Sequence, residues 1–149
     1  MENLSIKSKE KSPEIFCNAE SGDLVFKGKS IPENAALIYK PVIEWATEYI
    51  KSAGEETNLH LDLEYFNTAS SIWIAKLIKV LSEINNRGRL FVIHIYFDIE
   101  DFDEMDEHDL AEVISPVTES LSGAKVSMGI KVYGKDESDS VIREKLILL

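Results

Sequence analysis

The sequence predicts an α/β domain with a mixed β-sheet, and two observations support this fold class. Segments that alternate apolar and polar side chains, as strands do, take turns along the chain with segments whose apolar residues recur at helical spacing. The strand-like segment 90–97 is apolar almost throughout, which is typical of a central strand buried on both faces. Strands that are separated by helices favour parallel pairing, so we expect at least one parallel pair in the sheet.

The first strands are predicted in the N-terminal half. Short apolar runs at 14–17 and 24–26 are separated by the turn-forming residues 18–23, which is typical of a β-hairpin. Residues 59–65 alternate apolar with polar side chains and predict a strand that is buried on one face. Residues 1–12 are rich in lysine, glutamate and serine, so we expect them to form a flexible N-terminal arm.

The first helix is predicted from Asn34 onward, between the hairpin and the next strand. Apolar residues recur there at helical spacing and Trp45 continues their stripe, so we expect Trp45 in the core between helix and sheet. Residues 32–34 should lead into the helix, with the side chain of Asn34 or Ser30 as its cap. Pro41 lies inside the pattern and should kink the helix or reset its first turn.

The second half of the chain continues the alternation of helices and strands. A second helix is predicted over 74–84, because its apolar residues lie along one face and Gly88 follows its end. The acidic stretch 98–109 leads into a third predicted helix, which has its apolar residues between 110 and 121. Residues 125–133 alternate like a strand and complete the sheet.

Composition indicates one acidic globular domain, which we place at 13–133, followed by a tail, 134–149, whose structure is left open. The 149 residues are enough to bury a core without metal or disulfide bonds. The formal net charge of -11 repels phosphate backbones and anionic lipid, so we expect neither nucleic acid nor a membrane as a partner. A protein with a basic or apolar patch is favoured instead. Cys17 is the only cysteine, which indicates a small buried residue and a reducing cytoplasm.

Motifs for catalysis or cofactor binding are weak. Residues 28–30, Gly-Lys-Ser, resemble the end of a phosphate-binding loop, but its first glycine is displaced by one position and the preceding segment is a hairpin. The acidic run 98–109 lacks the glycine of a calcium loop; it is interpreted as solvated residues before a helix, or as a docking surface for a basic partner. His60, His94 and His108 share no metal-ligand spacing. We expect a protein that is not an enzyme, with no catalytic residue, metal or cofactor; the alternative is a small hydrolase that holds a divalent metal in the acidic stretch.

Residues 65–77, YFNTASSIWIAKL, place three hydroxyl side chains where a strand meets a helix. In one interpretation, Asn67 or Thr68 caps the helix by accepting a hydrogen bond from an unpaired backbone N–H, which contributes about 1 kcal/mol. In the other interpretation, an exposed hydroxyl at this corner is a phosphorylation switch, because the N-terminus of a helix tolerates a dianion. Phosphorylation would then change one surface patch while the fold is kept.

Two stretches carry a more specific pattern. Residues 28–49, GKSIPENAALIYKPVIEWATEY, contain Pro-Glu-Asn followed by a helix with a Pro-Val-x-Glu-Trp sequence. Residues 59–81, LHLDLEYFNTASSIWIAKLIKVL, contain a strand, an Asn-Thr-x-Ser motif and an amphipathic helix. Together with a looser match over 96–121, they resemble the SiaC family of bacterial regulatory phosphoproteins. The resemblance implies a domain related to the STAS domains of anti-sigma factor antagonists, with a mixed sheet and its helices packed mainly on one face.

The resemblance also implies how such a domain acts. In the family, a dedicated kinase phosphorylates the threonine after the asparagine and a PP2C-type phosphatase removes the phosphate. The unphosphorylated form binds and activates an effector protein, a diguanylate cyclase in the best-known branch. By position the phosphoacceptor is Thr68, and Asn67, Ser70 and Ser71 are expected to bind the partner beside it, while Ala69 stands where a serine is common. The alternative is a conventional anti-sigma factor antagonist, which would share the fold and the switch but bind an anti-sigma kinase.

Overall fold

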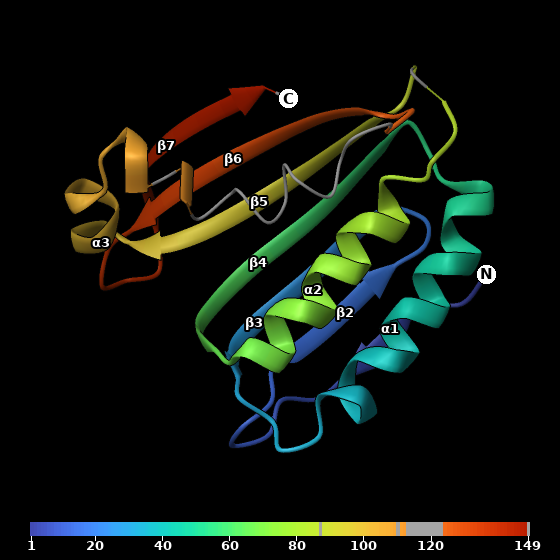
Figure 1. Ribbon diagram of the computed structural model, residues 1–149, viewed down its shortest axis with the longest axis horizontal. Coiled ribbons are helices and arrows are strands. Elements are labelled where there is room, and N and C mark those ends of the chain that lie inside the picture. Colours follow the sequence, from blue (N-terminus) through green and yellow to red (C-terminus); the bar gives the residue numbers. More distant parts are fainter. Residues whose placement is uncertain (87, 110, 113–123, 149) are drawn as a thin grey trace.

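Seven strands form one mixed sheet, in which they lie side by side in their order along the chain (Figure 1). The computed structural model describes residues 1–86, 88–109, 111–112 and 124–148. The inner neighbours β3 to β6 pair in parallel, whereas β1, β2 and β7 pair antiparallel at the two sides. The strands are β1 (Leu4–Ile6), β2 (Glu14–Asn18), β3 (Asp23–Ser30), β4 (Glu56–Phe66), β5 (Leu90–Asp98), β6 (Ser127–Lys135) and β7 (Val141–Leu148).

Two helices connect the parallel strands and cover the same face of the sheet (Figure 1). Helix α1 (Ala35–Tyr49) joins β3 to β4, with a 3-10 turn, η1 (Ile50–Ser52), after it, and α2 (Thr68–Leu81) joins β4 to β5. The short helix α3 (Ile99–Glu104) follows β5. Both α1 and α2 begin at the end of the sheet where β3 and β4 end. The predicted mixed sheet, with its helices mainly on one face, is confirmed.

The core lies between the two long helices and the sheet face beneath them. Trp45 is 8% exposed, as predicted, and its ring stacks on Tyr49 with 5.0 Å between the ring centroids. Cys17 is fully buried, and this burial raises the pKa of its thiol to about 12, so it is an inert core residue. The largest fully buried side chains come from both layers: Tyr39, Tyr49, Phe26, Phe91, Ile15, Leu24, Leu59, Leu77, Ile78, Leu81, Ile93 and Ile130.

The predicted hairpin is confirmed as the antiparallel pair β2 and β3. Gly22 in its turn has a φ of 78°, which favours glycine, and a Cβ at this position would lie 2.4 Å from the carbonyl oxygen of Glu56. The turn therefore needs a glycine both for its backbone conformation and for the close approach of β4.

Both ends of the chain join the sheet, which corrects the predicted domain limits. Residues 4–6 were expected in a flexible arm, but they form β1, whose Leu4 lies opposite Cys17 of β2. Nε1 of Trp45 also donates a hydrogen bond to the carbonyl oxygen of Glu2, at 2.9 Å. The C-terminal tail forms β7, which pairs with β6 along most of its length. The sheet thus extends beyond residues 13–133 on both sides.

The start of α1 differs from the prediction in its cap. Asn34 occupies the cap position, but its side chain makes no capping hydrogen bond. Ser30 cannot cap α1 either, because its buried hydroxyl is bonded to Tyr39 and Ser70. Pro41 lies on the exposed side of α1, well beyond the first turn that begins at Ala35, so it does not reset that turn.

The acidic stretch contains a helix of its own, α3, which the sequence patterns did not predict. The predicted third helix falls mainly on residues 110 and 113–121, which lie outside the described residues. Within the ranges that the structure describes, no helix is both long and apolar enough to cross a membrane.

Candidate functional site

The candidate site is the corner where β4 ends and α2 begins. The backbone N–H of Asn67 donates to the carbonyl oxygen of Ser30 at 2.9 Å, and the extended conformation of Asn67 then turns the chain into the helix. Its Oδ1 accepts a hydrogen bond from the N–H of Ser70, also at 2.9 Å. The cap of α2 is therefore the Asn67 amide, one of the two predicted side chains, and neither Thr68 nor a neighbouring hydroxyl supplies it.

A buried chain of hydroxyl groups fixes this corner against the core. The Oγ of Ser70 donates to the carbonyl oxygen of Ser30 at 2.9 Å, and the Oγ of Ser30 donates to the Oγ of Ser70 at 2.8 Å. Because Ser30 has one hydroxyl proton, the Tyr39 hydroxyl is the donor in its 2.6 Å bond with the Oγ of Ser30. Burial raises the pKa of Tyr39, which keeps this donor protonated. The three side chains link β3, α1 and α2.

The predicted site residues are placed differently with respect to solvent. Ser70 is fully buried, so in this conformation it positions the helix, and its predicted contact with a partner stays a prediction. Asn67 and Ser71 are half-buried, and the Oγ of Ser71 donates to the carbonyl oxygen of Thr68 at 2.8 Å. Thr68 itself is exposed, as is Ala69 beside it. Within the described part of the chain, the Thr68 hydroxyl makes no hydrogen bond.

Exposed apolar side chains gather at this end of the molecule. They belong to the end of β4, to the residue that follows β3 and to the first two turns of α1 and α2, and Figure 1 shows these segments at one end of the sheet. Large apolar residues are seldom left this accessible in a cluster, and such clusters mark interaction sites. We call these five residues the apolar patch: Ile31 (38% exposed), Leu37 (73%), Tyr65 (63%), Phe66 (58%) and Ile72 (52%).

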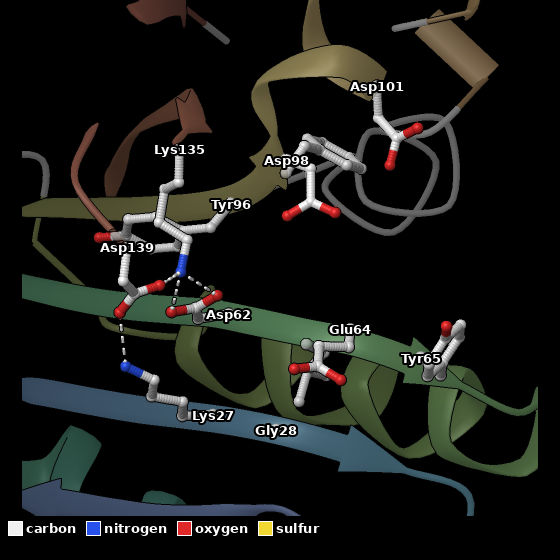
Figure 2. A pocket seen from close by; sticks show the side chains of 12 residues that line it. Lys27, Gly28, Asp62, Glu64, Tyr65, Tyr96, Asp98, Asp101, Lys135 and Asp139 are labelled. Carbon is white, nitrogen blue, oxygen red and sulfur yellow. Dashed lines mark hydrogen bonds and ion pairs between the residues drawn. The ribbon is translucent and has the colours of Figure 1, made fainter. Parts of the chain in front are cut away.

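A second feature lies on the face of the sheet that α1 and α2 leave uncovered. It is a trough of about 380 Å³, and Asp62 of β4 points into it beside Lys135 of β6 (Figure 2). Nζ of Lys135 donates to both carboxylate oxygens of Asp62, at 2.8 and 2.7 Å, and also binds Asp139. The hydrogen bonds from Lys135 and then from Lys27 lower the pKa of Asp139 to about 2. These groups neutralise one another, which gives them a structural role.

The carboxylates at the other end of the trough are not neutralised in this way. Figure 2 shows Glu64, Asp98 and Asp101 apart from the lysines, and no ion pair joins them to another described residue. Among the residues for which the structure gives positions, no group of three or more His, Cys, Asp or Glu side chains could hold a metal ion. This end of the trough therefore presents an acidic surface.

Two histidines that the sequence analysis treated separately lie together on the same face. His60 and His94 are opposite each other on β4 and β5, and their rings stack with 4.3 Å between centroids. His94 is bonded on both ring nitrogens, to the Tyr133 hydroxyl and to Oδ1 of Asn58, each at 2.7 Å. Burial and then the neighbouring His60 lower the pKa of His94 to about 4, so it is neutral at pH 7. Each histidine is the fifth residue of its strand, but the predicted strand began at residue 59, so the sequence patterns did not indicate this pair.

Comparison with known proteins identifies the fold and the family. The family model described as SiaC family regulatory phosphoprotein matches residues 6–121. An uncharacterized protein of Pseudomonas aeruginosa strain UCBPP-PA14, PA14_02130, is 28% identical over 98 residues, which cover 66% of this chain and 78% of that protein.

Solved structures show the same architecture. SiaC of Pseudomonas aeruginosa is 27% identical with a TM-score of 0.61, over 70% of this chain and 91% of that one. A SiaC chain from the crystal structure of the diguanylate cyclase SiaD in complex with its activator SiaC, from the same organism, gives a TM-score of 0.65 over 87% of this chain and 99% of that chain. At 24% identity, that second likeness concerns the fold alone. Since the family model covers most of the chain and includes the Asn67-Thr68 corner, this protein belongs to the SiaC family of regulatory phosphoproteins.

Proposed function

We propose that this protein is a phosphorylation-controlled binding module, without catalytic activity, whose switch is Thr68. The observation that carries the proposal is the state of the hydroxyl groups at the start of α2. The Ser70 hydroxyl is buried and engaged twice, and the Ser71 hydroxyl is bonded to the backbone. Thr68 alone combines an exposed side chain with a hydroxyl that has no partner among the described residues of this corner. A kinase can therefore reach Thr68 without disturbing the fold.

The local structure favours a phosphate at this position. The first backbone N–H groups of a helix have no intrahelical acceptors, and the helix dipole stabilises negative charge there. Asn67 satisfies the N–H of Ser70, which leaves the N–H groups of Thr68 and Ala69 available to phosphate oxygens. Because Asn67 supplies the cap, phosphorylation does not remove it.

The apolar patch supports the proposal that a partner covers Thr68. A phosphate adds about -1.5 to -2 charges and three acceptor oxygens. On a chain with a net charge of -11 the overall field changes little, so any regulation must act locally. A partner that buries the neutral hydroxyl would have to desolvate a dianion, and a loss of about 3 kcal/mol weakens binding by roughly two orders of magnitude.

We further propose that the partner is an effector enzyme, a diguanylate cyclase, and that a dedicated kinase and a PP2C-type phosphatase set the state of Thr68 in the cytoplasm. The complex of SiaC with the diguanylate cyclase SiaD, which it activates, supports this choice of effector. The family description as regulatory phosphoproteins supports the switch.

Mass spectrometry of the protein from its native host tests the switch. We expect a phosphorylated fraction with the phosphate on Thr68, and weaker binding of that fraction to the effector recovered with the unphosphorylated protein. Phosphate on Ser70 or Ser71 with none on Thr68, or equal effector affinity of both fractions, would show that the proposal is wrong. Recovery of an anti-sigma kinase in place of a diguanylate cyclase would identify the protein as an anti-sigma factor antagonist.

A further inference from the structure

The exposed side of α2 presents three residues in a fixed order. Thr68, Ile72 and Lys76 follow one another at intervals of four positions, and residues four apart are neighbours on a helix surface. All three are exposed, and Nζ of Lys76 lies 4.4 Å from the ring centroid of Trp73. A partner that covers Thr68 along α2 therefore meets an apolar side chain one turn away and an ammonium group two turns away.

Lysines also border other residues of the apolar patch. Lys40 follows Leu37 by three positions on α1, and both are exposed. Nζ of Lys29 lies 5.7 Å from the ring centroid of Tyr65. Where the structure defines positions, Lys29, Lys40 and Lys76 form no ion pair with a carboxylate. Three ammonium groups without an ion pair to a described carboxylate thus lie beside members of the patch.

The charge beside the patch is opposite to the charge of the whole chain. Between Tyr65 and Ser82 the sequence has two lysines and no acidic residue, although the net charge of the chain is -11. Of the carboxylates near the patch, Asp62 is paired with Lys135 and Glu33 with Lys11, while Glu64 lines the trough beside Tyr65 without an ion pair to another described residue. Exposed charges more than about 8 Å apart are largely screened at physiological ionic strength, so a docked segment senses the lysines beside the patch more strongly than the distant carboxylates of the chain.

We infer that the segment of the effector that docks on the apolar patch combines apolar side chains with aspartate or glutamate side chains that reach Lys29, Lys40 and Lys76. The inference rests on the proposed function, which places the docking surface around Thr68. It differs from the basic partner that the composition favours, because a docked segment senses local charge. A phosphate on Thr68 then repels the acidic side chains of the segment, in addition to the cost of its own desolvation.

A random peptide library displayed on phage and selected on the unphosphorylated protein tests this chemistry. We expect the selected peptides to be enriched, relative to the unselected library, in large apolar residues together with Asp and Glu. A synthetic consensus peptide, measured by fluorescence polarisation, should bind at least about fivefold more weakly to Ile72→Ser and to Lys76→Glu, because each removes one of the two attractions.

Matched variants elsewhere on the surface provide the controls. Ile142 of β7 is 52% exposed, the same as Ile72, so Ile142→Ser removes an equally accessible apolar side chain away from the patch. Lys125→Glu makes the same charge change as Lys76→Glu at another exposed site. Both controls should leave the peptide affinity within about twofold of wild type.

Several results would overturn the inference: enrichment of Lys and Arg, no enrichment at all, or equal losses in the patch variants and their controls. These results can be distinguished from a failure of the proposed function. If phosphorylation of Thr68 lowers effector affinity while the selected peptides lack acidic residues, the inferred acidic docking segment is wrong and the proposed Thr68 switch is supported. If acidic peptides bind at the patch while phosphorylation leaves effector affinity unchanged, the proposed Thr68 switch is wrong and the inferred acidic docking segment is supported.

Discussion

Replacing Asn67 and Thr68 one at a time separates helix capping from the proposed switch. Asn67→Ala removes the amide oxygen that accepts from the Ser70 N–H at 2.9 Å and leaves that donor without its acceptor. Loss of an N-cap side chain costs typically about 1 kcal/mol, and the hydrogen bond from Nδ2 to the carbonyl oxygen of Pro32 is lost as well. We expect the free energy of unfolding to fall by about 1–2 kcal/mol.

Thr68→Ala should have a much smaller effect on stability. It removes an exposed hydroxyl that has no hydrogen-bond partner among the described residues, and alanine favours the helix by a few tenths of a kcal/mol more than threonine does. The two contributions are small, so the free energy of unfolding should change by less than about 0.5 kcal/mol. If Thr68 supplied the cap, as one interpretation of the sequence holds, its removal would cost about 1 kcal/mol.

Urea denaturation followed by tryptophan fluorescence measures this difference. With a denaturant slope of roughly 2 kcal/mol per molar, Asn67→Ala should lower the midpoint by about 0.5–1 M, and Thr68→Ala should shift it by less than about 0.25 M. Asn67→Ser is the matched control, because a serine hydroxyl can also cap a helix. A large loss for Thr68→Ala with none for Asn67→Ala would refute the assignment of the cap.

Three further outcomes are expected. Trp45→Ala should lower the free energy of unfolding by about 3–5 kcal/mol, because it empties a core site; a loss below about 1 kcal/mol in thermal denaturation would contradict this burial. Thr68→Glu should weaken effector binding in titration calorimetry with little change in Tm, and a large drop in Tm would show that the helix start does not tolerate the charge. The folded-state pKa of His94, about 4, lies below its ordinary value, so burying the neutral ring favours the folded state. This contribution to the free energy of unfolding is complete above roughly pH 6.5 and is lost as the pH falls toward 4. Between pH 7 and pH 5 the free energy of unfolding of the wild type should fall by about 2 kcal/mol more than that of His94→Gln. Equal decreases in the two proteins would show that protonation of His94 is not the cause.

Periodic patterns in the sequence were sufficient to predict the inner part of the fold. The apolar stripe that contains Trp45 defined the buried side of α1, because a helix can bury a stripe only by placing it against the sheet. The apolar run from Leu90 indicated an inner strand, and β5 lies between two parallel neighbours. These predictions succeeded because the relevant information is local, within one element.

The remaining features depend on contacts between distant residues, which no local pattern records. The strand β1 exists because residues 4–6 pair with β2, although their composition is that of a flexible arm. The pairing of His60 with His94 depends on the register of two strands separated by a whole helix. Ser30 could be read as a cap of α1 from its position in sequence, but the fold places it against Ser70.

The same distant contacts indicate how a phosphate on Thr68 would affect the protein. The hydroxyl chain of Tyr39, Ser30 and Ser70 is buried and satisfied without Thr68, so adding a phosphate removes none of its hydrogen bonds. The cap from Asn67 is also independent of the Thr68 side chain. The Thr68 hydroxyl itself makes no hydrogen bond to another residue in the described part of the chain, so no such contact links it to the core. A phosphate would therefore act locally, through its charge and its hydration at the edge of the apolar patch. The phosphorylated and unphosphorylated proteins would then differ in partner binding and not in fold.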